Sequence, residues 1–339
     1  MAAPFKEYMK LLILNTNDPY YNLAVEEYLF DNCEEEMFIL WQNEPSVVIG
    51  KNQNAFAEID LDYAKENNIK IVRRITGGGA VYHDLGNLNF SYISPHHDGG
   101  IDFKKFTYPI VIALRSLNLD AELSGRNDIL INGKKVSGNA QFSKNGRVLH
   151  HGTILFNSDL SVLSSALRVD PSKISAKAIK SVRARVTNIK SELKSDVSLS
   201  EFRDIIAEHV KKTFGANEIE APISVEIKKL YKRNSSKEWI FPEREYLSKY
   251  SLRFKKRFDF GILEFLFAMK NETVESLSIF GDFFEKRAVS ELEELFKGKT
   301  LNEIKSNYKE FKTENYIYGM TSDNLLDLLQ NESLPKNNI

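Results

Sequence analysis

Residues 73–84 read Arg-Arg-Ile-Thr-Gly-Gly-Gly-Ala-Val-Tyr-His-Asp, and the interpretation of the whole chain starts from this stretch. Three adjacent glycines lie between paired arginines and an end that carries an imidazole. Because glycine has no Cβ, a ligand can come within hydrogen-bonding distance of the main chain there, and successive N–H groups can form an anion-binding concavity. The neighbouring Arg74 favours a phosphate or a carboxylate as that ligand.

Strand-like segments flank the glycines, at residues 69–72 before them and at residues 88–93 after them. The glycine run is therefore expected to be a loop that joins strands, and a tight hairpin stays open as its simplest interpretation. The chain has no G-x-x-x-x-G-K-[ST] sequence, and the glycine spacing does not match G-x-G-x-x-G at the start of a helix. Neither a P-loop nor a dinucleotide-binding fold is predicted.

Length and charge narrow the class of protein. A chain of 339 residues is long enough for one large domain and a smaller one. With 46 Lys and Arg against 47 Asp and Glu, its overall charge gives no reason to expect nucleic acid as a partner. No apolar stretch approaches the roughly 20 residues that span a bilayer. Residues 1–7 lack the apolar core of a signal peptide, so we expect a cytoplasmic protein without a membrane partner.

Cys33 is the single cysteine, which excludes an internal disulfide and a metal site built from several thiolates of one chain. It ends an amphipathic segment at residues 22–32. That position favours a small buried side chain over a nucleophile.

The pattern of residues 1–215 alternates between helix and strand, which predicts a mixed α/β fold with mixed sheets flanked by helices. Helices are expected at residues 23–31, 103–117 and 199–214, the last opened by a Ser198–Glu201 capping box. Strands are expected at residues 37–41, 46–50, 129–131, 135–137 and 152–156. Asn132-Gly133 predicts a hairpin, so Lys134 and Lys135 should leave a tight turn with their side chains on opposite faces of a strand.

A second break in organisation falls at residues 239–245, after the polar stretch 232–237, and the composition there is typical of a linker. Beyond it the pattern predicts strands at residues 261–270 and 274–280 and helices at residues 289–296 and 322–330. We therefore expect a large domain at residues 1–244 and a small α+β domain at residues 245–339, which carries no obvious catalytic cluster.

Residues 167–188 are strongly basic, with six cations opposed only by Asp170. The six are Arg168, Lys173, Lys177, Lys180, Arg183 and Arg185. One interpretation is a solvated loop or helix face, as charge runs usually are. The other is a mobile cover over an anionic ligand or a docking strip for an acidic partner, and the residues alone do not separate the two.

Three further stretches combine glycine with ionisable or amide side chains near strand ends, at residues 125–129, 133–140 and 150–153. In the last of them, the adjacent His150 and His151 are expected to point to opposite faces of a strand. With the arginine and the glycines they supply what the activation of a carboxylate by ATP requires. Two anions must approach each other in that reaction, so positive charge has to be fixed where the carboxylate meets the α-phosphate. Lys135 is the residue expected to provide it.

Together these residues resemble the lipoate-protein ligases of the form that carries a C-terminal accessory domain. The matching elements occur in the family's order at residues 22–27, 73–84, 127–128, 135–138, 150–153 and 181–188, with a weaker match at 278–282. The resemblance implies the biotin/lipoate ligase fold for residues 1–244. It also implies a two-step reaction in which lipoate and magnesium ATP give lipoyl-adenylate, and the lipoyl group then passes to one lysine of an acceptor protein.

The resemblance also assigns roles to residues. ATP would bind at Arg74, Gly79, Ala80, Val81, Tyr82 and Lys135, and lipoate at Gly77, Gly78, Lys135 and His151. Lys135 would be catalytic. Asp128 is a further candidate, for orienting Lys135 or holding magnesium, and His83 or His151 for hydrogen bonds near the reacting carbonyl, and a purely structural role stays open for each. Gly138 and Arg183 are additional candidates for the site. Expected acceptors are the lipoyl domains of 2-oxoacid dehydrogenases or the glycine cleavage H protein.

Other functions stay open from the sequence. A lipoyltransferase of the same fold would use preformed lipoyl-adenylate, and a non-catalytic module would bind nucleotide or an acidic protein through the basic segment. An octanoyltransferase needs an acyl-carrying nucleophile such as a cysteine, and Cys33 lies in the wrong segment. Biotin ligases share the general fold but have a glycine-rich loop of a different pattern.

Overall fold

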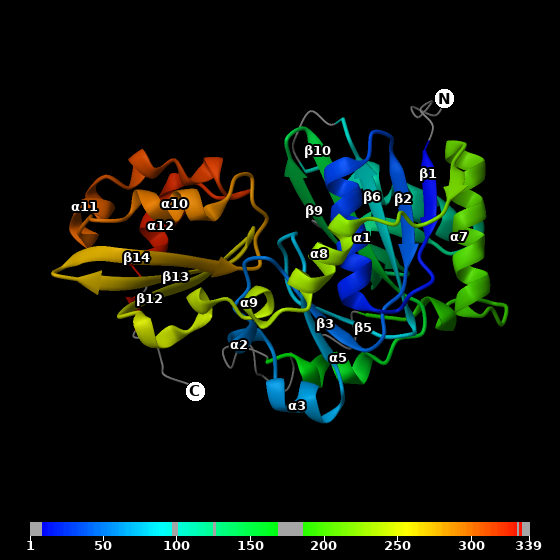
Figure 1. Ribbon diagram of the computed structural model, residues 1–339, viewed down its shortest axis with the longest axis horizontal. Helices are drawn as coiled ribbons and strands as arrows, with labels where there is room; N and C mark the ends of the chain where they lie inside the picture. Colours follow the sequence, from blue (N-terminus) through cyan, green and yellow to red (C-terminus); the bar gives the residue numbers. More distant parts are fainter. Residues whose placement is uncertain (1–8, 97–100, 125–126, 169–185, 331, 334–339) are drawn as a thin grey trace. The chain divides into compact units, whose positions relative to one another are not determined.

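The computed structural model describes residues 9–96, 101–124, 127–168, 186–330 and 332–333. The chain forms two compact units, drawn in Figure 1. Unit 1 consists of residues 1–48, 59–73 and 81–236. Unit 2 consists of residues 49–58, 74–80 and 237–339, so the glycine run groups with the C-terminal part of the chain. The division at residues 244 and 245 stays a prediction.

A mixed eight-stranded sheet forms the centre of unit 1, with the strand order β11-β1-β2-β6-β10-β9-β8-β7. Its strands are β1 Lys10–Ile13, β2 Met37–Trp41, β6 Asn87–Ser94, β7 Ala121–Ser124, β8 Asp128–Ile131, β9 Lys134–Lys144, β10 Arg147–Leu155 and β11 Asn217–Ile219. β1 runs parallel to β2 and β11, whereas the other pairs are antiparallel. The predicted mixed sheet is confirmed, but β9 and β10 are much longer than the sequence indicated.

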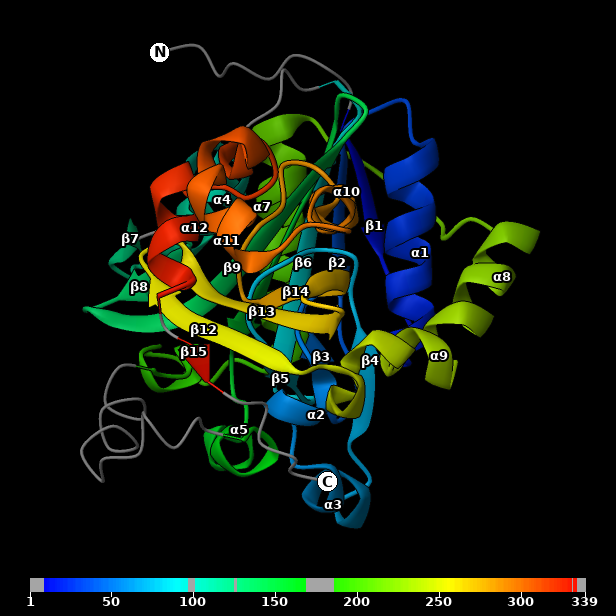
Figure 2. The same cartoon turned by 90° about the vertical axis from the view of Figure 1, so that its left-hand side faces the viewer.

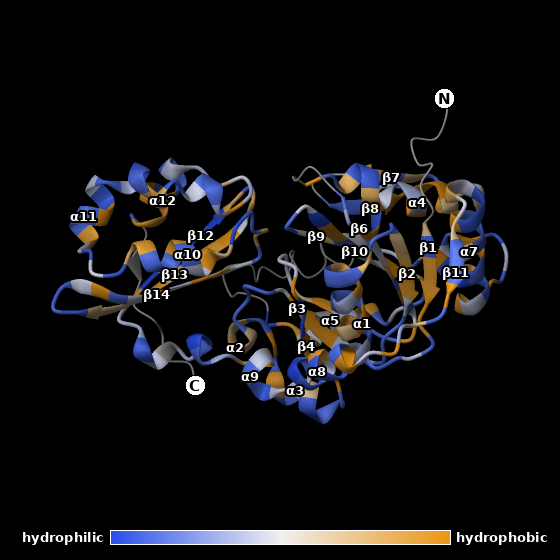
Figure 3. Ribbon diagram, turned by 45° about the horizontal axis from the view of Figure 1, so that its top comes forward, coloured by the Kyte–Doolittle hydropathy of each residue, from blue (hydrophilic) through white to orange (hydrophobic). Residues whose placement is uncertain are grey.

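Helices cover both faces of this sheet, as Figure 2 shows. On one face lie α4 (Phe103–Ser116) and α7 (Leu199–Phe214), and on the other lie α1 (Pro19–Asn32) and α8 (Val225–Asn234). Aromatic side chains of β2 and β6 form the main core with Phe106 of α4 and Phe202 of α7. Figure 3 shows the matching concentration of apolar residues in β1 and β2. The capping box predicted at Ser198 is present at the start of α7.

A separate three-stranded sheet has the order β4-β3-β5, with β3 (Ser46–Ile49) between β4 (Lys70–Arg73) and β5 (Val81–His83). The glycine run connects β4 to β5, which are not neighbours. Residues 74–80 therefore cross the end of β3 instead of closing a tight hairpin. This crossing excludes the simplest interpretation of the glycines.

Short helices complete unit 1. They are α3 Leu61–Glu66 and α5 Leu160–Ala166. The polar residues 232–237, which precede the predicted linker, comprise the end of α8, a turn at Ser235 and Ser236, and the first residue of α9 (Lys237–Ile240). The end of α8 is held against α1, because Arg233 forms a two-pronged ion pair with Glu27 and the Asn234 amide donates to the Tyr20 carbonyl.

Unit 2 is an α+β structure around a four-stranded sheet in the order β14-β13-β12-β15. Its elements are α2 Ala55–Glu58, β12 Leu252–Phe258, β13 Gly261–Lys270, β14 Thr273–Gly281, α10 Val289–Leu295, α11 Leu301–Ser306, α12 Ser322–Leu328 and β15 Glu332–Ser333. Phe254, Phe265 and Phe296 lie in its core. In the part of the chain that the structure describes, no helix is both long and apolar enough to span a membrane.

Candidate active site

Arg74 stabilises the conformation of the glycine run through hydrogen bonds inside the loop. Arg74 is buried, and its Nη2 donates to the carbonyls of Gly77 (2.7 Å) and Gly79 (2.8 Å). Its Nε donates to the Thr76 hydroxyl at 3.0 Å. The positive charge is thus fixed at the centre of residues 74–80, and the loop conformation depends on it.

The three glycines differ in the atoms that surround their backbone. A Cβ on Gly77 would lie 2.2 Å from the Phe283 carbonyl oxygen, which also accepts a 3.2 Å hydrogen bond from the Gly78 N–H. Gly78 has a φ of +89°, a value that favours glycine. A Cβ on Gly79 would meet nothing nearer than Asp282 Cβ at 4.0 Å. Gly79 is therefore the glycine with open space beside its backbone.

The residues after the glycines become progressively buried. Gly79 is exposed, Ala80 and Val81 are half-buried, and Tyr82 is buried. Burial raises the pKa of Tyr82 to about 12, with smaller contributions from the carboxylates of Asp84 and Asp159. The Tyr82 phenol is therefore neutral at physiological pH and able to donate a hydrogen bond.

His83 is a buried part of the β5 packing. Its Nδ1 lies 3.0 Å from Asn43 Nδ2, which can only donate, so Nδ1 is the acceptor. Its ring packs edge-on against the Trp41 indole, with 6.0 Å between the centroids. The role of His83 beside the reacting carbonyl stays a prediction.

Lys135 lies in a bulge at the start of β9. The β8–β9 turn is formed by Asn132 and Gly133, both with positive φ, which confirms the predicted hairpin. Leu130 of β8 pairs with Lys135 and Ile129 pairs with Ser137, so Val136 is an extra residue on β9. Bulges bend a strand and change the direction of its side chains. The extra residue follows Lys135, so the expectation that Lys134 and Lys135 point to opposite faces of the strand stays a prediction.

The side chain of Lys135 is held by Asp128. Lys135 Nζ lies 2.7 Å from Asp128 Oδ1, and the two side chains are 37% and 34% exposed. An ion pair this exposed contributes at most about 1 kcal/mol, so it orients the ammonium more than it stabilises the fold. The Lys135 carbonyl accepts a 3.0 Å hydrogen bond from the Thr187 N–H, which fixes its backbone. The neighbouring Lys134 is exposed.

Gly138 provides the space that the lysine side chain occupies. A Cβ on Gly138 would lie 3.0 Å from Lys135 Nζ and 3.1 Å from its Cε. Asp128, Lys135 and Gly138 thus form one cluster on β8 and β9. Arg183 and most of the basic segment, residues 169–185, lie outside the described residues.

The two adjacent histidines of β10 face opposite helical layers, as the sequence predicted. His150 is fully buried beside Phe90, Phe103 and Phe106, and burial holds its pKa well below the usual range. Its ring is therefore neutral. His151 faces α1 instead.

His151 belongs to a buried hydrogen-bonded group that the sequence did not resolve. Its Nδ1 lies 2.9 Å from Oε1 of the buried Glu26. The Ser91 hydroxyl donates to the same oxygen at 2.5 Å and accepts from Trp41 Nε1 at 2.8 Å. Glu26 belongs to residues 22–27, one of the stretches on which the family resemblance rests. Nothing in the sequence showed that this residue of α1 orients a histidine of β10.

The candidate residues fall in both compact units. Arg74, Gly77, Gly78, Gly79 and Ala80 belong to unit 2, whereas Val81, Tyr82, His83, Asp128, Lys135, Gly138 and His151 belong to unit 1. Among the described residues, no group of three or more His, Cys, Asp or Glu side chains could hold a metal ion.

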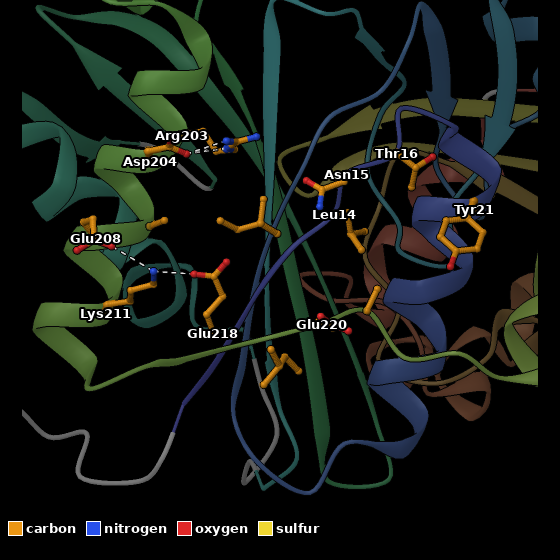
Figure 4. A pocket seen from close by; sticks show the side chains of 14 residues that line it. Leu14, Asn15, Thr16, Tyr21, Arg203, Asp204, Glu208, Lys211, Glu218 and Glu220 are labelled. Carbon is orange, nitrogen blue, oxygen red and sulfur yellow. Dashed lines mark hydrogen bonds and ion pairs between the residues drawn. The ribbon is translucent and has the colours of Figure 1, made fainter.

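An open pocket of about 890 Å³ lies elsewhere in unit 1, among the ends of β1 and β11 and helix α7 (Figure 4). No predicted site residue lines it. Arg203 is paired with Asp204, and Lys211 lies between Glu208 and Glu218. We do not assign this pocket to the active site.

The class of protein follows from comparison with known families. The model of the lipoyl protein ligase A/B catalytic domain matches residues 18–211, and that of the bacterial lipoate protein ligase C-terminus matches residues 248–329. The chain therefore belongs to the lipoate-protein ligase family, in the form with a C-terminal domain, and is an enzyme of this type. The family resemblance seen in the sequence is confirmed.

Individual relatives support this over nearly the full length. The chain is 40% identical to lipoate-protein ligase LplJ of Bacillus subtilis over 326 residues, covering 93% of this chain and 98% of the relative. It is 42% identical to lipoate–protein ligase 1 of Staphylococcus aureus over 292 residues, covering 84% and 88%. The lipoyltransferase and the non-catalytic module are not favoured.

Solved structures share the fold. Plasmodium falciparum LipL1 in complex with lipoate matches with a TM-score of 0.78 at 26% identity, covering 94% of this chain and 97% of that chain. A lipoate-protein ligase A bound with ATP matches with a TM-score of 0.58 at 32% identity, covering 69% and 98%. The predicted mixed α/β fold of a ligase with a C-terminal domain is confirmed.

Proposed function

We propose that this ligase activates free lipoate with ATP and transfers the lipoyl group to one lysine of an acceptor protein through Lys135. The observation that carries the proposal is the ammonium of Lys135, which is half-buried and lies 2.7 Å from Asp128 on a bulged strand. A lysine held in this way supplies fixed positive charge, which the reaction requires. The relatives named above support the same overall reaction.

In the first step a lipoate carboxylate oxygen attacks the α-phosphorus of ATP, and the bond to pyrophosphate breaks. Lys135 neutralises charge where the two anions meet. We assign the nucleotide to Arg74, to residues 79–82 and to Lys135. The open backbone at Gly79 and the neutral phenol of Tyr82 suit this role, because both can donate hydrogen bonds to an anion.

In the second step the amine of the acceptor lysine attacks the carbonyl carbon of lipoyl-adenylate, and AMP leaves. Negative charge develops on the carbonyl oxygen, and the Lys135 ammonium stabilises it. We assign lipoate to Gly77, Gly78, Lys135 and His151. The Glu26 carboxylate, 2.9 Å from His151 Nδ1, fixes the direction of that imidazole.

Magnesium enters with the nucleotide. The described residues contain no cluster of metal ligands, and the Asp128 carboxylate already pairs with Lys135. We assign magnesium to the phosphates of ATP, where it would neutralise charge and keep much of its water.

We propose lipoyl domains of 2-oxoacid dehydrogenases or the glycine cleavage H protein as acceptors. The solved structure of a bi-partite lipoate protein ligase and its E2 lipoyl domain, from Thermoplasma acidophilum, is similar to this chain, with a TM-score of 0.63 at 34% identity. We also propose that the reaction takes place in the cytoplasm, where ATP is available.

The test is a two-part assay with the purified full-length chain. Lipoate and magnesium ATP are mixed first without an acceptor, and pyrophosphate release is measured. Each purified acceptor is then added, and its mass is followed. We expect lipoate-dependent pyrophosphate release, followed by the gain of one lipoyl group. Lipoylation from synthetic lipoyl-adenylate without any pyrophosphate release from lipoate and ATP would instead identify a transferase.

A further inference from the structure

Asn139 joins three neighbouring strands behind Lys135. It lies on β9 and is buried. Its backbone N–H and its side-chain Nδ2 both donate to the Asn127 carbonyl, at 3.0 Å and 2.9 Å. In return, Asn127 Nδ2 donates to the Asn139 carbonyl at 2.5 Å. These three hydrogen bonds form a reciprocal clamp between residues 127 and 139, in which the Asn139 side chain makes one bond and its backbone makes two.

From this geometry we propose that Asn139 is a positioning residue for lipoate activation, because the clamp fixes the backbone from which Asp128 holds Lys135. The proposal rests on the role of Lys135 given above. Asn127 directly precedes Asp128, and Asp128 pairs with Gly138, the residue before Asn139. The clamp therefore acts one residue away from the carboxylate on both strands.

The clamp matters because the ion pair cannot position the lysine by itself. The two side chains are 37% and 34% exposed, and an exposed pair gains little against the rotamer entropy of a long side chain. The carboxylate can direct the Lys135 ammonium only if Asp128 is already held in place. The Asn127–Asn139 clamp supplies that constraint from the interior of the sheet.

His150 fixes the other end of the Asn139 side chain. Asn139 Nδ2 donates to the Asn127 carbonyl and lies 3.2 Å from the Ser137 hydroxyl, so the amide oxygen faces β10. That oxygen lies 3.3 Å from His150 Nε2, which must therefore carry the proton. The His150 ring is in turn packed beside Phe90 with 5.9 Å between the centroids. The amide is thus oriented by a rigid, neutral imidazole.

The position of the Asn139 side chain explains why residue 152 is a glycine. A Cβ on Gly152 would lie 2.2 Å from Asn139 Oδ1 and 2.6 Å from the Phe90 ring. A larger residue would displace the amide from its place between β8 and β10. The glycines at positions 138 and 152 therefore make room for Lys135 and for Asn139, respectively.

A double-mutant cycle tests whether Asn139 acts through Asp128. Asn139→Ala, Asp128→Asn and the double variant are compared by lipoate-dependent exchange of pyrophosphate into ATP. Val148→Ala, a buried change on β10, is the control for a general loss of stability. We expect each single site variant to lower kcat about tenfold with little change in KM for ATP, because the lysine is misplaced during chemistry. The double variant should match Asp128→Asn alone.

A fully additive loss in the double variant would show that Asn139 acts independently of Asp128, and it would overturn the proposal. Val148→Ala should keep its kcat at temperatures where it is folded. If Asn139→Ala is too unstable to purify, Asn139→Ser replaces it, because its hydroxyl is too short to bridge to the Asn127 carbonyl.

A second measurement does not depend on activity. The full-length chain is labelled with a trace of an amine-acetylating reagent, and the ratio of Lys135 to Lys134 modification is read by peptide mass spectrometry. The exposed Lys134 serves as the internal reference. Loss of the carboxylate contact should raise the ratio about two- to fivefold, and equally in Asn139→Ala and Asp128→Asn.

The ratio should stay at the wild-type value in Val148→Ala. An increased ratio in Asp128→Asn without an increase in Asn139→Ala would overturn the positioning role even in an active enzyme. A wild-type chain without lipoate-dependent exchange would refute the proposed function instead, and the labelling result would still decide the role of Asn139.

Discussion

Replacing Gly77 and Gly79 separately by alanine should have two different effects, because Gly77 is required for the fold of the loop whereas Gly79 faces the proposed ligand. At Gly77 the added Cβ would lie 2.2 Å from the Phe283 carbonyl oxygen and 3.3 Å from Phe284 Cα. Both neighbours are backbone atoms, which cannot rotate away. At Gly79 the nearest atom would be Asp282 Cβ at 4.0 Å, and the backbone there does not have positive φ.

The cost of Gly77→Ala follows from these distances. The Phe283 carbonyl oxygen must move from 2.2 Å to an ordinary van der Waals distance from the new Cβ. Overpacking of this kind costs about 1–3 kcal/mol. The shift also breaks the 3.2 Å hydrogen bond from the Gly78 N–H, which contributes about 1 kcal/mol. The total is about 2–4 kcal/mol. Gly79→Ala should be neutral, or stabilising by about 0.4–1 kcal/mol, because the unfolded chain loses freedom.

Urea unfolding and steady-state kinetics together separate the two effects. Gly77→Ala should lower the free energy of unfolding by the amount above. Gly79→Ala should keep the stability of the wild type and raise KM for ATP, because its methyl group occupies the space beside the backbone that we assign to the nucleotide. Equal stability losses in the two variants would refute the steric reasoning. An unchanged KM in Gly79→Ala would refute the assignment of that backbone to ATP.

Three further predictions concern single side chains. Burial raises the pKa of Cys33 to about 11, so alkylation of its thiol should be slow at pH 7.5 and accelerate up to that pKa, and Cys33→Ala should retain ligase activity; rapid labelling at neutral pH would contradict this. His150 stays neutral when folded but binds a proton when unfolded below pH 6.5, so the unfolding free energy should fall by up to about 1.4 kcal/mol per pH unit as the pH drops, and His150→Gln should remove that slope in acid titrations. Gly138→Ala should change stability by less than about 0.5 kcal/mol, since it touches the flexible end of Lys135, yet lower kcat for adenylation several-fold; unchanged kcat would show that the lysine needs no such space.

Local patterns in the sequence correctly predicted those features of the fold that depend on residues close together in the chain. The capping box at Ser198 placed α7, and the Asn132-Gly133 pair placed the turn before Lys135. The alternation of side chains along a strand correctly sent His150 and His151 to opposite faces of β10. In each case the deciding interaction spans only a few residues.

The remaining features depend on partners distant in sequence. The glycine run is no hairpin because β3 lies between the strands that it connects. The bulge at Val136 exists only in the pairing of β9 with β8. The end of α8 is held against α1 by Arg233, which pairs with Glu27 at a distance of 206 positions in the sequence. The Glu26–His151 contact spans 125 positions and left no local signal.

The most direct test of the central claim compares Lys135→Ala with Lys134→Ala. The two lysines are adjacent on β9, but Lys135 is held by Asp128 whereas Lys134 is exposed. The measurement is lipoate-dependent exchange of pyrophosphate into ATP, with circular dichroism to confirm folding. We predict that Lys135→Ala lowers exchange by at least about 100-fold and that Lys134→Ala stays within about twofold of the wild type. Exchange that survives in Lys135→Ala would contradict the account.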